Sequence, residues 1–338
     1  MLQDDPESER AWRDLGDELR SIEPGDLVPM MTLLDAARRA HEGKREYDAV
    51  ARMLKLEIGL AKDSPDREAL LTAELARVYD EEVLDDAEAT KAFERLLVLR
   101  PGDLTAEEAL EKGGAKREKW AELVARYEEE SNKSGEEAAF KSSLLVSAAE
   151  TAYRYGRPTL LGKEGKKNKK KLEALNEEMI DRLQRALAID PKNKRAVLLL
   201  ERLYRQGGHF EALSAMLEEH AIETSSKEER VATLLRLARV YKRDLKSDEG
   251  AVRAYEAVND LQPGNGTATS ALVDHFTAKE DWDHLIALYD EQLATGVAKG
   301  PAEVGVVLQI VMVQWKMKKR PDQALPYFER LRRLEPTQ

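Results

Sequence analysis

A repeat of 72 or 73 residues runs through most of the chain and limits the folds that it can adopt. An aromatic residue opens the second segment of each repeat, at Tyr47, Trp120, Phe210 and Trp282. A proline closes each fourth segment, at Pro101, Pro191, Pro263 and Pro336. Successive openings are 73, 90 and 72 residues apart, and successive prolines are 90, 72 and 73 residues apart, so both sets give the same unit. Self-similarity over such a length is typical of solenoid proteins, which stack copies of one supersecondary unit.

Each repeat has the pattern of four amphipathic helices separated by short polar turns. The third and the seventh residue after each opening aromatic are apolar, and this spacing places them on one face of a helix. We therefore predict the closing helix of an incomplete repeat followed by four full units, at residues 1–26, 27–103, 104–192, 193–265 and 266–338.

One unit is longer than the others because a basic segment interrupts it. Residues 156–171, GRPTLLGKEGKKNKKK, hold six lysines and one arginine against one glutamate, and their length accounts for the spacing of 90. Glycine, proline and like charges offer little to bury, which predicts a solvated, mobile loop that projects from the array. The alternative is an electrostatic contact with phosphate, nucleic acid or an acidic membrane surface. The segment has no aromatic residue on which a base could stack.

Charge and cysteine content exclude several functions. The formal net charge of −11 disfavours nucleic acid as a partner, and the absence of cysteine excludes disulfides and thiolate chemistry. No apolar run reaches the roughly 18 residues of a membrane span. The N-terminal stretch, MLQDDPESER, is acidic and so unlike a signal peptide. We predict a soluble, cytoplasmic protein that neither spans a membrane nor binds nucleic acid.

No arrangement of side chains predicts catalysis, a cofactor or a metal. The five histidines include no pair at i and i+4 around a glutamate, and no cysteine can complete a zinc site. His275 and His284, each beside an aspartate, form the only cluster, and we interpret them as surface histidines that flank a turn. Two glycine pairs are interpreted as equivalent turns between helices, Gly113-Gly114 and Gly207-Gly208. The chain is therefore predicted not to be an enzyme.

The half units resemble the tetratricopeptide repeat. That family pairs two helices, with a leucine, a small residue and an aromatic residue in the first, an alanine and an aromatic residue in the second, and a closing proline. Two pairs match in order, through Leu75, Ala76, Tyr79, Ala89, Phe93 and Pro101 and through Leu237, Ala238, Tyr241, Ala251, Tyr255 and Pro263. The alternate pairs match less well, with His284 in one where the family has a small residue. The resemblance implies an all-α fold, a right-handed α-α superhelical solenoid of such helix pairs.

By this resemblance the chain would be a non-catalytic protein-protein interaction scaffold that presents a concave groove to a peptide or protein partner. In the family the first helix of each pair lines the groove, and the matching positions here are Tyr204, Arg205, Arg236, Arg239, Lys242 and Arg243. Arginine forks here would hold the carboxylates of an acidic peptide. Alternatively, these charges only balance glutamates on neighbouring helices. Reversing Arg236 and Arg239 to glutamate is expected to leave stability nearly unchanged, because both are taken as exposed.

The other function class is a structural spacer or assembly segment of a longer solenoid. The lone closing helix from Trp12 to Pro24 and the last helix of the chain stop at the same phase of the repeat. The last helix has an apolar side with no helix after it, formed by Tyr327, Phe328, Leu331 and Leu334. Because terminal repeats normally carry a polar face, we predict that this side binds a second copy or the rest of a longer array.

Overall fold

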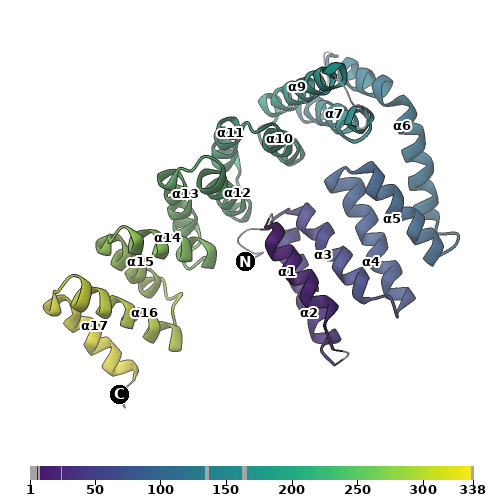
Figure 1. Cartoon of the computed structure of the whole chain (residues 1–338). Coiled ribbons are helices and arrows are strands. Elements are labelled where there is room, and N and C mark those ends of the chain that lie inside the picture. The colour runs from purple at the N-terminus through teal and green to yellow at the C-terminus, as the bar shows by residue number, and fades with distance from the viewer. Residues whose placement is uncertain (1–5, 7, 24, 134–136, 162–165, 336–338) are drawn as a thin grey trace. The chain divides into compact units, whose positions relative to one another are not determined.

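The computed structural model describes residues 6, 8–23, 25–133, 137–161 and 166–335 (Figure 1). These residues form seventeen α-helices and four short π-helical turns, with no strand among them. The prediction of an all-α fold is confirmed, while the handedness of the array stays a prediction. The chain divides into two compact units, Met1–Leu203 and Tyr204–Gln338, and the division falls inside the helix α10 (Lys194–Gly207).

In the unit that ends at Leu203, each helix from α2 to α6 packs against the next one in the chain, and α7 packs against α9. A continuous apolar core joins α3, α4 and α5 through Leu54, Ala76 and Leu96, and Trp12 of α1 belongs to a smaller cluster with α3. The helices of this unit before α10 are α1 (Glu9–Arg20), α2 (Leu27–Gly43), α3 (Tyr47–Leu60), α4 (Pro65–Arg77), α5 (Asp86–Leu99), α6 (Leu104–Ser131), α7 (Ala138–Thr151), α8 (Arg157–Leu161) and α9 (Lys166–Ile189).

In the unit that begins at Tyr204, each helix from α11 to α16 packs against the next one in the chain. Leu213, Leu217, Leu272 and Ile310 are at most 1% exposed, so the core runs between successive helices. The helices after α10 are α11 (Phe210–Glu223), α12 (Lys227–Arg239), α13 (Asp248–Leu261), α14 (Gly266–Ala278), α15 (Trp282–Ala294), α16 (Pro301–Met312) and α17 (Pro321–Leu334).

The residues that define the repeat also define the ends of helices. Three of the opening aromatics are the first residues of α3, α11 and α15. The fourth helices end two residues before the closing prolines, at Leu99, Ile189, Leu261 and Leu334. Caps fix equivalent starts, since Asp85 Oδ1 accepts from the amide of Ala87 over 3.1 Å before α5 and Ser247 Oγ accepts from the amide of Gly250 over 3.2 Å before α13. Pro336 lies outside the described residues.

The predicted turn at Gly113-Gly114 is wrong. Both glycines lie inside α6, which is 28 residues long and spans what was predicted as two helices. Within α6 the backbone departs from helical geometry only at Lys119, where φ is −113° and ψ is 19°, one residue before Trp120. At the other glycine pair, the backbone of Gly208 is left-handed, with φ at 71°, and α10 ends at Gly207. No residue of α6 is left-handed, so the two helices join through a kink and no turn forms.

The prediction of a loop is also wrong for the described parts of residues 156–171, which are helical. Gly156 ends a π-helical turn, residues 157–161 form α8, and the lysine-rich part from Lys166 is the first section of α9; residues 162–165 lie outside the described residues. Helix α9 has 24 residues, whereas α5, α13 and α17 have 14 each. Lysine has a high helix propensity, so the segment extends the amphipathic helix that follows it.

Four helices end in a π-helical turn, and all four are the third helix of a predicted unit. The turns are η1 (Val78–Val83), η2 (Ala152–Gly156), η3 (Val240–Asp244) and η4 (Val313–Met317). A π-turn holds more residues than an α-turn. Helices α4, α7, α12 and α16 therefore share the same irregularity at their C-terminal ends. After three of these turns the backbone enters the left-handed region, at Leu84 with φ 61°, Lys246 with φ 53° and Lys319 with φ 56°.

Candidate functional site

Four of the six predicted groove residues lie at least partly at the surface. Lys242 is exposed, and Arg205, Arg239 and Arg243 are half-buried. Two of them converge on Asp244, because Arg205 Nη1 lies 3.5 Å from its Oδ2 and Arg243 Nε donates to its Oδ1 over 2.9 Å. We call Arg205, Arg239, Lys242 and Arg243 the basic face. The carboxylate of Asp244 makes this face less positive than the count of its cations implies.

The other two predicted residues, Tyr204 and Arg236, are buried, which corrects the assumption that the whole set faces solvent. Their exposed fractions are 6% and 7%. The Tyr204 ring meets His209 edge to face at 6.2 Å between ring centres, and Arg236 Nη2 donates to Thr233 Oγ1 over 3.2 Å. Arg236→Glu would bury a carboxylate where a guanidinium now makes that bond, and this costs free energy of folding. The expectation that the reversal leaves stability unchanged is therefore wrong.

The opposite face of α12 and η3 carries an open apolar groove. Leu234, Leu237 and Tyr241 occupy positions i, i+3 and i+7 and therefore share one side, while Arg236 and Arg239 project from the other. The three residues line a depression of about 600 Å³ whose walls are α11 and α13. We call it the α12 groove. Its volume is within the roughly 300–1,000 Å³ of ligand sites in proteins.

Small residues on α13 keep the α12 groove open. Gly250, Ala254 and Ala257 recur at i, i+4 and i+7 on the side of α13 that lines it. Gly250 is needed there because a Cβ at this position would lie 2.5 Å from the ring of Tyr241. The wall formed by α11 presents Ile222, which is 74% exposed. An exposed apolar surface beside an apolar groove is the usual mark of a binding surface.

The rim of the α12 groove carries charged residues of both signs. Glu218 Oε1 accepts a hydrogen bond from the Tyr241 hydroxyl over 2.5 Å, and burial together with this bond raises the pKa of Tyr241. Arg230 Nη2 donates to the carbonyl oxygen of Thr224 over 2.7 Å. The other two rim residues are exposed, and they are Arg253 and Asp260.

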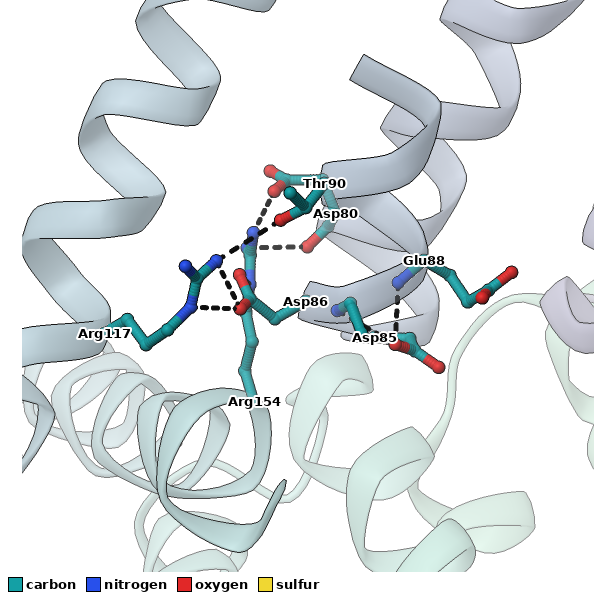
Figure 2. Close-up of polar contacts among 8 residues, drawn as sticks. Asp80, Asp85, Asp86, Glu88, Thr90, Arg117 and Arg154 are labelled. Atoms are coloured by element: carbon teal, nitrogen blue, oxygen red, sulfur yellow. Dashed lines mark hydrogen bonds and ion pairs between the residues drawn. The ribbon is translucent and has the colours of Figure 1, made fainter. Parts of the chain in front are cut away.

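A separate polar cluster surrounds the N-terminus of α5. Figure 2 shows Arg117 of α6 and Arg154 of η2 converging on the carboxylates of Asp86 and Asp80. Arg117 Nε donates to Asp86 Oδ2 over 2.6 Å, and this bond raises the pKa of Arg117. Arg154 Nη1 donates to the carbonyl oxygen of Asp80 over 3.0 Å and also binds its carboxylate. Because carboxylates already engage both guanidinium groups, the cluster joins the helices of successive repeats and is not an open anion site.

Metal sites and membrane spans are both absent from the described residues. No group of three or more histidine, aspartate and glutamate side chains there could hold a metal ion. In the same part of the chain, no helix combines the length and the apolar character that crossing a membrane requires. His284 lies in the first turn of α15 and bonds to the N-cap residue Asp281, with its Nδ1 2.8 Å from Asp281 Oδ2 and its ring stacked on Phe276 at 5.4 Å between ring centres.

Residues 268–303 match the family model of the tetratricopeptide repeat. The match covers α14 and α15, so the chain contains a repeat of this family, as the resemblance predicted. The matched pair is one of the alternate pairs, the one in which His284 replaces the small residue. No curated protein matched the chain in sequence.

Several solved structures match at low similarity. The human IFIT1 dimer with m7Gppp-AAAA is 15% identical with a TM-score of 0.31, over 98% of this chain and 65% of that chain. Naa15/Naa10 bound to HypK-THB is 14% identical with a TM-score of 0.34, over 90% of this chain and 51% of that one. The tetratricopeptide domain of P58(IPK) is 16% identical with a TM-score of 0.21, over 96% and 92%. This chain spans less than two thirds of the first two, and at these scores the likeness says nothing about its partners.

Proposed function

We propose that the chain is a non-catalytic scaffold that binds protein partners on the surfaces of its helical repeats. The observation that carries the proposal is the α12 groove, an open apolar depression with a volume of about 600 Å³ that is bordered by charged residues. Apolar surface flanked by polar residues is the general composition of a protein-binding site. The tetratricopeptide match at residues 268–303 supports the same function, because repeats of this kind present extended binding surfaces.

The basic face forms the second part of the proposal. Exposed Lys242 and half-buried Arg239 and Arg243 would contact the carboxylates of an acidic segment of a partner. Nucleic acid is a less suitable partner for a chain with a net charge of −11, because phosphates would be repelled by the body around this small face. A cytoplasmic location fits this function and stays a prediction.

Site-specific photo-crosslinking in cells tests the scaffold function. A photoreactive residue is placed at Ile222 in the α12 groove, at Lys242 on the basic face, or at Val98 of α5 as the control. Val98 is a suitable control because it is 68% exposed and Ile222 is 74% exposed. The expected result is discrete crosslinked proteins from Ile222 or Lys242 and only background from Val98. Background from all three positions would refute the proposal.

The spacer function remains the second candidate, and one observation favours it. Helix α17 and the turn η4 expose Trp315, Leu325 and Phe328, with exposed fractions of 52%, 58% and 37%. The rings of Trp315 and Phe328 contact each other edge to face at 5.6 Å between centres. An apolar surface of this kind suits contact with further helices.

A further inference from the structure

We propose that the α12 groove binds one amphipathic helix of a partner protein, with the acidic N-terminal end of that helix at Arg253 and its basic C-terminal end at Asp260. This inference rests on the proposed scaffold function and specifies the ligand of one surface. Four properties of the groove support a bound helix: its length, walls whose backbone groups are already hydrogen-bonded, its small residues and the order of its rim charges.

The length of the groove matches a short helix. On the side of α12 and η3 it extends from Arg230 to Tyr241, which is about 16 Å at the helical rise of 1.5 Å per residue. A partner helix of three turns has the same length. Its apolar side chains at i, i+3, i+4 and i+7 would contact Leu234 and Leu237, which is the usual way in which a helix binds a hydrophobic groove.

The walls of the groove favour a helix over an extended peptide. They are formed by α11, α12 and α13, whose backbone N–H and C=O groups bond within each helix. An extended peptide would bring its own backbone groups into an apolar groove with no strand edge to pair with, and each unpaired group costs free energy. A helix satisfies its backbone internally and so avoids this loss.

The small residues on α13 let a helix approach closely. Gly250, Ala254 and Ala257 lie along one side of α13 at i, i+4 and i+7. Such a row lets the side chains of a second helix fit between the ridges of the first. Ile222 on the opposite wall would lose most of its exposed apolar surface under a bound helix, which favours binding.

The rim charges set the direction of the bound helix. Glu218 and Arg230 already bond to Tyr241 and Thr224, whereas the side chains of Arg253 and Asp260 make no hydrogen bond or ion pair among the described residues. Arg253 and Asp260 are seven residues apart, which is two helical turns or about 10.5 Å along α13. Helices favour acidic residues near the N-terminus and basic residues near the C-terminus. A partner with that polarity therefore runs parallel to α13.

A designed peptide tests the inference with the purified full chain. The probe is an acetylated and amidated helix of about 14 residues, with leucines at i, i+3, i+4 and i+7, a glutamate in its first half and a lysine seven residues later. A twin peptide exchanges the glutamate and the lysine. Binding of each labelled peptide is measured by fluorescence anisotropy. The first peptide should bind a few-fold more tightly than the twin, as expected for partly exposed ion pairs.

Two variants and a control decide the outcome. Arg253→Glu with Asp260→Lys should reverse the preference between the two peptides. Ala257→Phe should fill the groove and weaken both by about tenfold or more, whereas Ala215→Phe, at an exposed position of α11 outside the groove, should leave both unchanged. Circular dichroism confirms that each variant is folded. Equal binding of both peptides with no reversal, or full binding to Ala257→Phe, overturns the inference.

The inference and the scaffold function can fail separately. If the peptides ignore the groove while Lys242 still crosslinks to discrete proteins, the helix assignment is wrong and the scaffold function stands. If neither Ile222 nor Lys242 crosslinks in cells and the peptides also ignore the groove, both are wrong.

Discussion

Arg38 bonds to three acidic side chains from three successive helices. Its guanidinium is buried in α2 and bonds to Glu57 of α3 over 2.8 Å, to Glu74 of α4 over 2.5 Å and to Asp35 of its own helix over 2.5 Å. Glu57 is only 1% exposed. Burial raises the pKa of the Glu57 carboxyl, although the bond and the charge of Arg38 act in the opposite direction. Three successive helices therefore depend on one guanidinium.

Replacing Arg38 by methionine should destabilise the chain by about 3–5 kcal/mol near pH 7, because the Glu57 carboxylate would stay buried without its partner. The loss should shrink as the pH falls, because the buried Glu57 carboxyl then becomes protonated. Glu57 has a native pKa above its ordinary value, so its contribution to stability is largest below that ordinary value and is lost as the pH rises through the native pKa. Urea unfolding midpoints at several pH values measure the effect.

The double variant Arg38→Met with Glu57→Met is the control for this prediction. Replacing both members of a buried ion pair by apolar residues is often neutral, so the double variant should recover much of the lost stability and should not share the pH dependence. A single variant as stable as the parent at neutral pH would contradict the assignment of Arg38.

Lys246 adopts a left-handed backbone, with φ at 53°, two residues after η3 ends. A residue with a Cβ is strained there and glycine is not. Lys246→Gly should therefore raise the unfolding free energy by roughly 0.5–1 kcal/mol. Lys242→Gly, four residues earlier inside η3, is the matched control and should lower it by about 1 kcal/mol. Thermal unfolding of both variants measures the difference, and a loss at Lys246 as large as that at Lys242 would contradict the strain.

For single residues, the sequence predicts the burial of apolar side chains better than the exposure of charged ones. The apolar positions after the opening aromatics were predicted as a helical face, and Val50, Leu54, Leu213 and Leu217 are completely buried. Arg236 was predicted at the surface because the family resemblance placed it on the groove side of its helix, but its position in α12 places it in the interior beside Thr233. The burial of an arginine depends on which side of its helix meets the neighbouring helices, and the sequence of that helix alone does not contain this information.

Among the helices, α15 shows how a cap and a histidine depend on each other. Asp281 accepts from the amide of His284 over 3.3 Å as the N-cap and also bonds to the His284 ring. This bond raises the pKa of His284 and lowers that of Asp281. The stabilisation by this pair is therefore complete between the ordinary pKa values of aspartate, about 3.9, and histidine, about 6.5. It is lost as the pH rises through the native pKa of His284 and as it falls through the native pKa of Asp281.

Asp281→Asn should lower the pKa of His284 toward its ordinary value without removing the cap, because asparagine is also a good N-cap residue. NMR titration of the His284 ring measures this shift. Asp281→Ala should lower the pKa similarly and, in addition, destabilise the chain by about 1 kcal/mol through loss of the cap. An unchanged His284 pKa in both variants would show that Asp281 does not control it.

The order of the helices was predictable from the sequence, and their irregularities were not. The starts at Tyr47, Phe210 and Trp282 follow from the repeat. The joining of two helices in α6 was missed because the glycines suggested a turn. Gly113 is instead buried within α6, which has its kink at Lys119. The lysine-rich start of α9 was predicted as a loop from its charge. The row of Gly250, Ala254 and Ala257 was visible in the sequence, but the α12 groove exists only because α11 lies opposite α13.

For the whole molecule, the exposed apolar surface at the C-terminal end predicts association between copies. Leu325→Glu with Phe328→Glu should reduce any concentration-dependent association of the chain and its binding of a hydrophobic dye, because it places charges on that surface. Sedimentation velocity over a range of concentrations measures the effect. Leu70→Glu with Val98→Glu is the matched control, since these residues are 60% and 68% exposed on α4 and α5. Equal association of both double variants would assign the contact elsewhere.

The repeat period was predictable at the scale of the whole chain, but the division into compact units was not. The boundaries predicted at 26, 103, 192 and 265 follow the sequence repeat and stay predictions. The two compact units instead divide between Leu203 and Tyr204, inside α10. No composition shift marks this point, because one amphipathic helix serves both units and its sequence is continuous.

The four π-helical turns also bear on the ancestry of the chain. They follow α4, α7, α12 and α16, whereas the intervening helices α2, α10 and α14 end without one. A π-turn is a local insertion in an α-helix, and four separate insertions at equivalent places are far less economical than one insertion that was then copied. Copying a single helix pair would have placed the turn in every pair. A duplicated block of two helix pairs, four helices in all, therefore accounts for the positions of all four turns with one insertion.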